Sequence, residues 1–444
     1  MMDAVFLSRI QFGLTAGFHF IFPPLTLGLT LGLLIVEIIH VRTGDALYLK
    51  ISTFLVKILG LVFVMGVATG IVLEFSFGAN WSNYSRMVGD IFGAPLAAEG
   101  IFAFFLESVF LGILIFGRNR VSRRTYLLSV FLVFFASHLS GLWIIIANSW
   151  MQTPAGYSLA GNRAVLTNFL EAALNGSTLV RFSHTVIGGW ITGSLFTAGI
   201  ASWYLLKERD QPLARPLLVV SLWIFIAAAI LQFGAGHRHS GQVARTQPEK
   251  MASFEALWET RAGAPMSIIG LPDPVGKKTR FEISIPRLLS LGIYFDPNAT
   301  VTGLNEFSED ELPPLLATYF SYHLMIFMGS LFALMSLIAL TLIARKKIYE
   351  SRWFLAVLVI TVPLPFMANI LGWMSAEIGR QPWAVYRVLR TAEAASVVVP
   401  AGQILFSIIM FSAIYILLFS VFLRLLFMII RKGPEHATTG YLGE

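Results

Sequence analysis

Long apolar runs separated by short polar stretches are the dominant pattern along this chain. Two of them are FLVKILGLVFVMGVATGIVL (54–73) and ILFSIIMFSAIYILLFSVFL (404–423). A helical run of about 20 apolar residues matches the hydrocarbon thickness of a membrane. The pattern predicts an all-α integral membrane protein with nine transmembrane helices, at about residues 13–39, 52–75, 95–117, 125–147, 179–206, 216–236, 316–344, 353–376 and 398–423.

The composition agrees with a membrane protein and excludes a soluble fold. Of the 444 residues, 56% are hydrophobic and 13% are charged, whereas a soluble domain has about 25% charged residues. The chain has no cysteine. That absence excludes disulfides, iron–sulfur clusters, thiolate metal sites and covalently attached c-type heme, so any heme must be held without a covalent link.

Basic residues are concentrated in every second loop. The positive-inside rule places those loops in the cytoplasm, with the N-terminus outside and the C-terminus inside. Membrane topology therefore explains the formal net charge of +7, and nucleic-acid binding is not needed. The basic set comprises Arg42, Lys50, Arg118, Arg120, Arg123, Arg124, Lys207, Arg209, Arg215, Arg345, Lys346, Lys347, Arg352, Arg431 and Lys432, whereas the alternate short loops carry mainly Arg86, Arg163, Arg380, Arg387 and Arg390.

A polar, proline-containing segment, residues 237–315, separates the sixth and seventh predicted helices. On the predicted topology this segment is an extracytoplasmic loop. It contains apolar side chains such as Phe254 and Trp258, so we expect a folded lid; a floppy connector is the alternative for so long a loop. The expected organisation is helices one to six in 1–236, the loop in 237–315, and helices seven to nine in 316–444.

Ionisable side chains interrupt several predicted helices. Such groups are costly in hydrocarbon and usually face a protein interior for a functional reason. They are His19, Lys57, Glu74, Glu99, Glu107, His138, His184, His323 and Glu377.

Five candidate iron ligands, on five different helices, share one expected depth. His19, Glu99, His184, Met325 and Glu377 lie near the outer helix ends, within about 15 Å of the outer surface at about 1.5 Å per residue. A His/Met or His/His pair makes a six-coordinate electron-transfer heme, whereas a single His or carboxylate leaves a position open for oxygen. The alternative is an ordinary helix-contact histidine or a packing methionine at each position.

His323 and Met325 compete for the same role. They are two residues apart, about 200° around a helix, so both cannot face one iron. Residue chemistry alone favours His323 as the ligand.

A second group of polar residues suggests a proton path from the cytoplasm. Lys57 lies near the inner end of the second helix, and Glu107 and Ser108 lie inward of Glu99 in the third. Glu99 and Glu107 are about 80° apart on that helix and share one broad face, and Ser140 of the fourth helix could bridge. A buried carboxylate is a good proton relay. Alternatively, the lysine snorkels and the serines bond to their own helices.

Five stretches together resemble subunit I of the cytochrome bd-type quinol oxidases. The similarity extends over nearly the whole chain, and the last and third stretches are the most specific. The stretches are SRIQFGLTAGFHFIFPPLTLG (8–28), GVATGIVLEFSFGANWSNYS (66–85), VGDIFGAPLAAEGIFAFFLES (88–108), LWIIIANSWMQTP (142–154) and GWMSAEIGRQPW (372–383).

The resemblance implies a role for each candidate ligand. His184 and Met325 would ligate a low-spin heme b that receives quinol electrons. His19 would ligate the heme at which oxygen binds, with Glu99 close by, and Glu377 would ligate a second, high-spin heme b. The other residues that it places at the cofactors are Arg9, Trp373 and Arg380.

The resemblance also assigns the proton path and the quinol site. Segment KMASFEALWET (250–260) resembles the quinol-site segment, which puts Lys250 and Glu255 at a site where quinol must shed protons. The proton-path positions of the family are matched by Lys57, Glu107, Ser108 and Ser140.

The implied enzyme is a terminal respiratory oxidase of a prokaryotic cytoplasmic (inner) membrane. It would oxidise quinol at the outer face and reduce oxygen to water with inside protons, generating proton-motive force without pumping. Expected partners are quinol, oxygen, membrane lipid and a homologous membrane subunit II, with no nucleic acid. The sequence leaves open heme d or a b-type substitute at the oxygen site, the quinone, cyanide sensitivity and membership of the cyanide-insensitive branch, and a small single-span subunit.

Two features depart from better-known members of this family. His323 stands where those members carry arginine, which puts the potential of the low-spin heme in question. GHRHSG (236–241) replaces an acidic stretch, which puts details of the quinol site in question. The loop is of the short type, without a further insertion.

Two other functional classes compete with the oxidase. A proton-coupled transporter would explain the buried carboxylates, but the chain has no evident internal repeat and the ligand set would be unexplained. A diheme b electron-transfer subunit would explain His184 and Met325, but Glu99, Glu107 and Glu377 would have no role.

Overall fold

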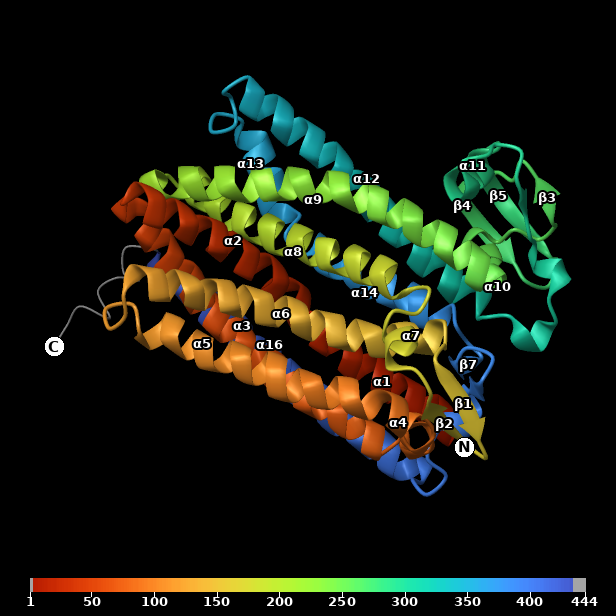
Figure 1. Cartoon of the computed structure of the whole chain (residues 1–444). Coiled ribbons are helices and arrows are strands. Elements are labelled where there is room, and N and C mark those ends of the chain that lie inside the picture. The colour runs from red at the N-terminus through yellow and green to blue at the C-terminus, as the bar shows by residue number, and fades with distance from the viewer. Residues whose placement is uncertain (1–2, 434–444) are drawn as a thin grey trace.

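The computed structural model describes residues 3–433, which form a bundle of long helices with a small folded lobe at one end (Figure 1). In this part of the chain, eight helices or helix runs are long and apolar enough to cross a membrane, and counting one bent pair as a span gives nine. The elements are α1–α2 (Ala4–His19, Phe22–Thr43), α3 (Ala46–Gly78), α4–η1–α5 (Ser82–Ala98, Glu99–Phe104, Phe105–Phe116), α6 (Arg123–Gln152), α8 (Thr178–Leu206), α9 (Gln211–Thr246), α12 (Leu315–Ala344), the bent pair α13–α14 (Arg352–Ile360, Leu364–Ile378) and α16 (Ala401–Lys432).

Three of these runs contain a break in regular α-helical geometry. Between α1 and α2, Pro23 and Pro24 follow the break, and proline cannot donate the helical hydrogen bond. Between α13 and α14 the axis bends by 40°, at Pro363. The third run contains the π-helical turn η1, which begins at Glu99, and such turns often mark functional positions. The first and third breaks thus lie directly beside two predicted site residues, His19 and Glu99.

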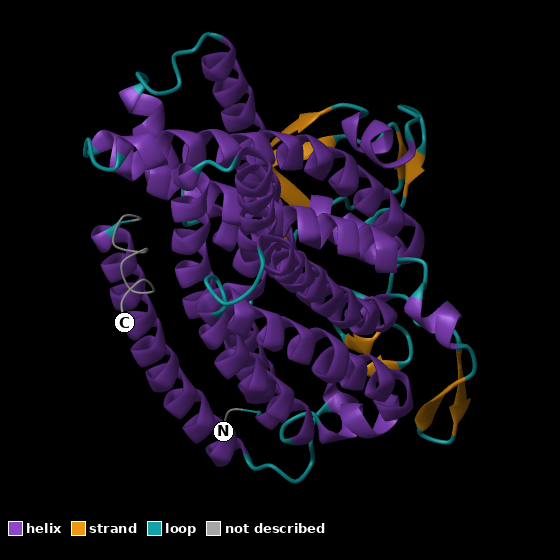
Figure 2. Ribbon diagram, turned by 60° about the vertical axis from the view of Figure 1, so that its left-hand side comes forward, coloured by secondary structure: helices purple, strands orange, loops and turns teal. Residues whose placement is uncertain are grey.

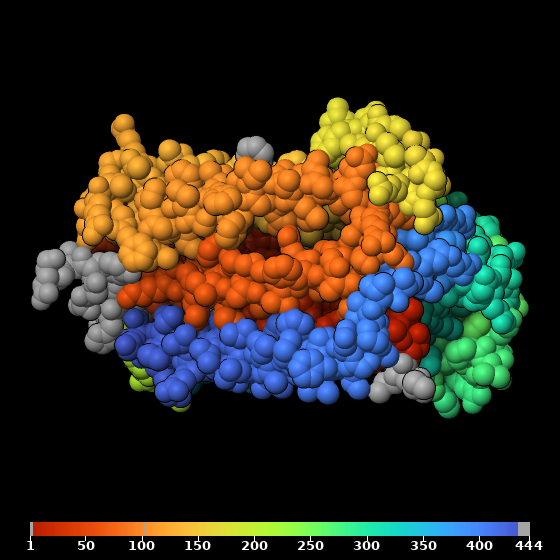
Figure 3. Space-filling model, turned by 90° about the horizontal axis from the view of Figure 1, so that it is seen from below, coloured from red at the N-terminus to blue at the C-terminus, as the bar shows by residue number. Residues whose placement is uncertain are grey.

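Helix α8 forms the centre of the bundle and α16 lies at its margin. Of the most apolar stretch of each, 89% is buried in α8 and 17% in α16. Gly28 of α2 and Gly193 of α8 lie face to face, and a Cβ on either would overlap the other's backbone. Small residues at such a crossing let two helices approach closely. Figure 2 shows α16 along one margin, and Figure 3 shows it beside α3, so one side of α16 is left for lipid or a partner.

A buried ion pair ties α2 to the connection between α5 and α6, at the end of the bundle opposite the lobe. Arg118 donates from Nη1 and Nη2 to the two carboxylate oxygens of Glu37, at 2.9 and 3.0 Å. Ser52 donates to the same carboxylate at 2.5 Å, and the guanidinium lies 3.7 Å from the centre of the Tyr126 ring. Because removal of one partner of a buried pair is strongly destabilising, we regard this contact as structural.

The lobe is built from the segment between α9 and α12. Helix α9 continues to Thr246, past the expected end of the sixth span at residue 236. Beyond it the chain folds into short helices and antiparallel strand pairs, with β4 paired to β5 and β3 to β6. The elements are α10 (Pro248–Glu255), β3 (Arg261–Ala262), β4 (Met266–Asp273), β5 (Lys278–Ile285), α11 (Leu288–Tyr294), β6 (Thr300–Val301), η2 (Leu304–Glu306) and η3 (Glu309–Glu311).

Shorter connections complete the same end of the bundle. Strands β1 and β2 pair with each other, as do β7 and β8. These elements are β1 (Tyr157–Ala160), β2 (Arg163–Leu166), α7 (Phe169–Ala173), β7 (Trp383–Val385), β8 (Leu389–Arg390) and α15 (Thr391–Ala394).

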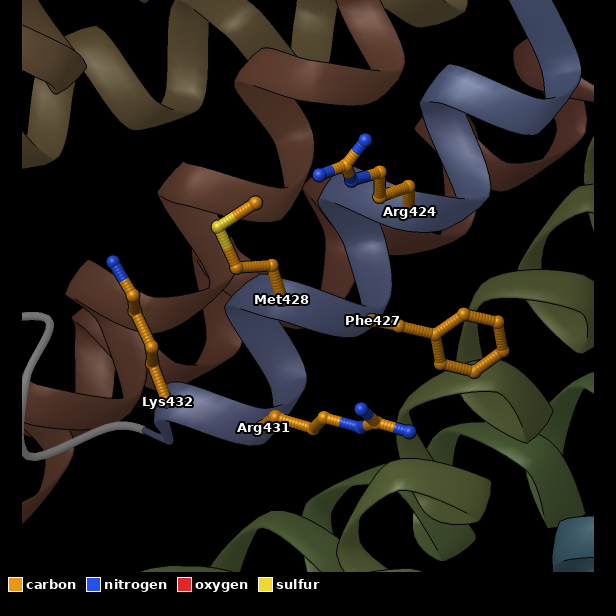
Figure 4. Close-up of a pocket in the computed structure, with 5 residues that line it drawn as sticks. All are labelled: Arg424, Phe427, Met428, Arg431 and Lys432. Carbon is orange, nitrogen blue, oxygen red and sulfur yellow. The ribbon is translucent and has the colours of Figure 1, made fainter.

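An open hollow of about 490 Å³ lies at the C-terminal end of α16. Figure 4 shows the side chains that line it. None of them belongs to the predicted ligand, quinol or proton-path sets, so this hollow is separate from the candidate site. The lining residues are Arg424, Phe427, Met428, Arg431 and Lys432.

Candidate functional site

His19 is held in one tautomer by its neighbour on α3. Its Nδ1 lies 2.9 Å from the hydroxyl oxygen of Thr69. That hydroxyl already donates to the carbonyl of Met65 at 2.8 Å, so it accepts from His19 Nδ1–H. The Nε2 lone pair is then available for a metal, which is the usual arrangement of a ligating histidine. A Cβ added at Gly70 would lie 3.2 Å from His19 Cε1, so the glycine leaves room beside the ring.

His184 lies on the face of α8 that meets α9. The side-chain nitrogen of Gln232 is 3.2 Å from Nδ1 and 3.3 Å from Nε2. The ring of His239 is 5.3 Å away between centroids. A Cβ at Gly236 would lie 3.6 Å from the ring, so this histidine too has a glycine beside it.

Met325 and His323 point to different neighbours. A Cβ at Gly372 of α14 would lie 2.9 Å from Met325 Sδ. His323 instead has Nε2 3.0 Å from the carbonyl of Ser267 in β4. The structure therefore turns Met325 toward α14 and His323 toward the lobe, and Met325 as the heme ligand stays a prediction.

Glu377 lies in a buried polar cluster near the lobe end of α14. Arg380 Nη2 pairs with Oε2 at 2.5 Å. Oε1 accepts from Asn148 at 2.9 Å and from Gln152 at 3.2 Å. Arg181 of α8 in turn donates to the side-chain oxygen of Asn148. Three helices, α6, α8 and α14, thus meet at this carboxylate.

Lys250 of the lobe reaches the same cluster. It is 2% exposed, and its Nζ donates to Gln152 Oε1 at 2.6 Å. Burial is the main cause that holds the pKa of Lys250 well below its usual value, and the charges of Arg181 and Arg380 lower it further. Gln152 therefore joins the predicted quinol-site lysine to the predicted heme ligand Glu377.

Glu255, at the end of α10, has one carboxylate oxygen that accepts a hydrogen bond and one that does not. Oε2 accepts from the backbone N–H of Ser267 at 3.1 Å. Oε1 is buried and makes no hydrogen bond within residues 3–433. Burial raises the pKa of Glu255 to about 8, and the charge of Glu282 contributes. A carboxyl group in this setting can take up or release a proton near neutral pH.

Glu99 and Ser140 form the predicted bridge between two spans. Ser140 Oγ donates to Glu99 Oε1 at 2.8 Å. Glu107 is buried at 8% exposure and lies within electrostatic range of Glu99, as does Glu74 of α3. Glu99 and Glu107 therefore lie on the successive segments η1 and α5, with Ser140 of α6 and Glu74 of α3 beside Glu99.

The two inner members of the predicted path are less closely connected. Ser108 donates to the carbonyl of Phe105 in its own helix at 3.1 Å. This is the alternative expected for the serines, a hydrogen bond to their own helix. Lys57 lies within electrostatic range of Lys432 near the end of α16. The hydrogen bond of Ser108 therefore stays within its own helix and does not reach the Glu107 carboxylate.

The remaining predicted cofactor residues occupy different surroundings. Arg380 is 5% exposed, within the Glu377 cluster. The ring of Trp373 lies 6.4 Å from that of Phe12 on α1, so it joins α14 to the first span. Arg9 is exposed on α1, and among residues 3–433 no hydrogen bond or ion pair joins it to this cluster.

The helix ends alone do not place the five candidate ligands at one depth. Helix α1 begins at Ala4 and α4 at Ser82, earlier than the expected starts at 13 and 95. His19 lies about 22 Å and Glu99 about 25 Å along these helices. The apolar-run criterion detects only the hydrocarbon segment, so it missed these polar extensions. Contacts instead define two groups, one around His184 and Glu377 and one around His19 and Glu99.

The donor set fits heme better than a bare metal ion. Among the described residues no group of three or more His, Cys, Asp or Glu could hold a metal. Heme needs only one or two axial ligands because the porphyrin supplies the other four. Glycines lie beside three of the predicted ligands, and buried polar atoms without partners lie around the cluster, as expected for a bulky group with anionic propionates. These atoms are Arg181 Nε, Arg380 Nη1, His239 Nε2 and Gln232 Oε1.

Four residues of this cluster were absent from the sequence prediction. Arg181 lies within the predicted fifth helix, so its charge in a membrane segment was a usable signal. Asn148 and Gln152 lie in the stretch 142–154 but after the predicted end of the fourth helix at residue 147, where polar side chains are expected and do not mark a site. His239 lies in the stretch 236–241, which differs from better-known members of the family. It reaches His184 only because α9 continues beyond the predicted end of the sixth helix.

Comparison with known proteins gives consistent matches over the whole chain. A family model described as cytochrome bd terminal oxidase subunit I matches residues 7–434. Cytochrome bd ubiquinol oxidase subunit 1 of Bacillus subtilis (strain 168) is 37% identical, over 98% of this chain and 95% of the relative. Cytochrome bd-II ubiquinol oxidase subunit 1 of Escherichia coli (strain K12) is 36% identical, over 98% of each chain. The solved structure of bd oxidase from Geobacillus thermodenitrificans matches with a TM-score of 0.92 and 28% identity, covering 97% of this chain and 99% of that one.

Proposed function

The chain belongs to the cytochrome bd terminal oxidase subunit I family, and from that premise we propose where on the molecule each part of its reaction takes place. It is a heme-containing quinol:oxygen oxidoreductase of a bacterial membrane and acts within a multi-subunit complex. Because the chain belongs to this family, we set aside the two alternative functions, a proton-coupled transporter and a diheme electron-transfer subunit. Quinol is oxidised at the lobe, and oxygen is reduced in the His19–Glu99 region.

The heme ligands in this proposal are the four residues predicted from the resemblance. His184 and Met325 hold a low-spin heme b, Glu377 holds a high-spin heme b, and His19 holds heme d or a b-type substitute. When bound, the hemes supply the one-electron chemistry that takes electrons from quinol and gives them to oxygen. Thr69 keeps His19 Nε2 available. Arg380 pairs with the Glu377 carboxylate and orients it, and Arg181 holds Asn148, which donates to the same carboxylate.

The observation that carries the proposal is the hydrogen-bonded connection from the lobe to the ligand cluster. Lys250 donates to Gln152, and Gln152 donates to Glu377. A quinol that binds beside Lys250 and Glu255 is therefore close to groups that accept its protons and to the ligand set that receives its electrons. The open Oε1 of Glu255 is the group that accepts a proton from a quinol hydroxyl.

Protons for oxygen reduction reach the opposite side of the site in this proposal. Glu107 holds a proton, and Glu99, oriented by Ser140, passes it toward the His19 region. The lobe faces outside, the C-terminal end of α16 faces the cytoplasm, and subunit II is the membrane partner. Each charge separated across the membrane in this way stores about 2.3 kcal/mol per 100 mV.

Uniformly oriented vesicles that contain the purified complex test this arrangement. A pH dye on each side would follow proton release and uptake after quinol is added to an aerobic suspension. We expect acidification on the lobe side and alkalinisation on the other. Release and uptake on the same side would contradict the proposed separation of the two half-reactions.

The pH dependence of quinol oxidation tests the role of Glu255. Below a pKa of about 8 the carboxyl group is mostly protonated and cannot accept a proton. The value of kcat/KM for quinol should therefore rise as the pH increases toward 8 and level off above it. Glu255→Gln should lower kcat/KM about 100-fold and remove this rise. A steady-state assay from pH 6 to pH 9 measures both, and an unchanged profile in the variant would remove Glu255 from the proposal.

A further inference from the structure

His323 forms a hydrogen bond with the backbone of the lobe, at a residue far from it in the sequence. Its Nε2 lies 3.0 Å from the carbonyl oxygen of Ser267 in β4. A ring nitrogen that faces a carbonyl oxygen can only donate, so this bond needs a proton on Nε2. Nδ1 faces a second carbonyl oxygen, that of Tyr319 in the same helix, also at 3.0 Å, so the bond to Ser267 is the one that leaves α12. The bond joins α12, which carries Met325 two residues later, to the first strand of the β4–β5 hairpin.

The surroundings fix both partners of this bond. The ring of Tyr319 stacks on the ring of His323 with centroids 3.9 Å apart. The Tyr319 hydroxyl lies 3.0 Å from Ser267 Oγ. Tyr319 and Ser267 are 1% and 4% exposed, whereas His323 is half-buried, so the junction is closed on the side of Tyr319 and Ser267.

The other side of the Ser267 backbone holds the predicted quinol-site carboxylate. The N–H of Ser267 donates to Glu255 Oε2 at 3.1 Å. One residue thus receives a hydrogen bond from His323 at its carbonyl and gives one to Glu255 at its amide. If β4 moved away from α12, the amide would move with it, and Glu255 would lose the only hydrogen bond that the described residues give to its carboxylate.

We propose that His323 is a positioning residue of the quinol site, which locks β4 to α12 and thereby holds Glu255 in place for quinol. This inference rests on the proposed function for the identity of the ligand. It gives His323 a mechanical role in the lobe instead of a direct effect on the low-spin heme. Met325 faces Gly372 on α14, whereas His323 faces β4, so one helix contributes to both sites through different faces.

Two substitutions of His323 separate the hydrogen bond from the packing. His323→Phe keeps an aromatic ring for Tyr319 and removes the donor. We expect KM for quinol to rise about five- to tenfold, the effect of one lost hydrogen bond that is partly buried, with little change in kcat. His323→Gln keeps a donor at a similar reach and should restore most of the affinity. Hydrogen exchange of peptide 266–273 should become faster in the phenylalanine variant only.

The midpoint potential and the spectrum of the low-spin heme provide the discriminating readout. We expect both to match the wild type in His323→Phe. A shifted potential with an unchanged KM would overturn the proposal in favour of a direct effect on the heme. An unchanged KM with unchanged exchange would also overturn it, as would equal defects in the phenylalanine and glutamine variants.

A matched control is available at the other end of the bundle. His40 Nδ1 also lies 3.0 Å from a backbone carbonyl, that of Asp45, with no connection to the lobe. His40→Phe removes the same kind of bond and should leave KM for quinol and the exchange of peptide 266–273 unchanged. If the wild-type complex did not oxidise quinol at all, the proposed function would be wrong. Hydrogen exchange of peptide 266–273 would still decide whether His323 locks β4.

Discussion

Glu107→Gln should slow quinol-driven oxygen reduction about 100-fold or more while every heme stays bound. Glutamine has nearly the same shape as glutamate and can hydrogen-bond, but it cannot carry a proton, and a well-placed acid–base group contributes about 10²–10⁴ in rate. Glu107 is buried and lies within electrostatic range of Glu99, which Ser140 orients. Oxygen consumption measured with an electrode, together with heme content per chain, gives both quantities.

The matched control for this substitution is Glu107→Asp. It keeps a carboxyl group on a side chain one methylene shorter, so it should retain much more activity than the glutamine variant. Normal turnover in Glu107→Gln would show that the proton takes another route. Loss of heme in that variant would instead show that Glu107 has a structural role.

His184→Ala should abolish quinol oxidase activity by removing the low-spin heme b. Alanine cannot ligate iron, and the ring also fills the space between Gln232 and Gly236. The hemes assigned to His19 and Glu377 have other ligands and should remain. A reduced-minus-oxidised spectrum of the purified variant should therefore lose the low-spin b bands and keep the high-spin bands.

His138→Ala is the corresponding control. His138 is also a histidine within a span, but its Nε2 accepts from the indole N–H of Trp190 at 3.0 Å, and it lies outside the proposed ligand set. This variant should keep all hemes. Retention of the low-spin bands in His184→Ala would mean that another side chain ligates the iron, and His239, whose ring lies 5.3 Å away, would be the first candidate.

Hydropathy was sufficient to predict the bundle but not the ends of its helices. The apolar runs identified each membrane segment, because crossing hydrocarbon demands about 20 apolar residues. The polar extensions of helices, such as the start of α4 at Ser82 and the end of α9 at Thr246, need no apolar run. They form helix because they pack against other elements, and single-sequence patterns do not encode those contacts.

The rotation of a helix was the main quantity that the sequence could not supply. Spacing showed that His323 and Met325 face different directions, but not which one faces the bundle. The contacts decide this, since Gly372 lies at Met325 and Ser267 lies at His323. By contrast, the contact between Glu99 and Ser140 was predictable, because their expected depths and chemistry matched.

Uncharged partners of charged residues were the other gap. Asn148 and Gln152 hold Glu377, and Gln152 also holds Lys250. A buried carboxylate needs such donors, but the sequence does not say which of many amides will supply them. Only the folded chain brings α6, α14 and the lobe together.

A reduced-minus-oxidised optical spectrum of the purified protein, combined with heme extraction, would show which hemes the chain carries. We expect low-spin b bands together with high-spin bands from two further hemes, with a far-red band if the oxygen site holds heme d. Only low-spin b bands would contradict the proposed oxygen site and point to an electron-transfer subunit. A protein without heme bands would contradict the ligand assignments as a whole.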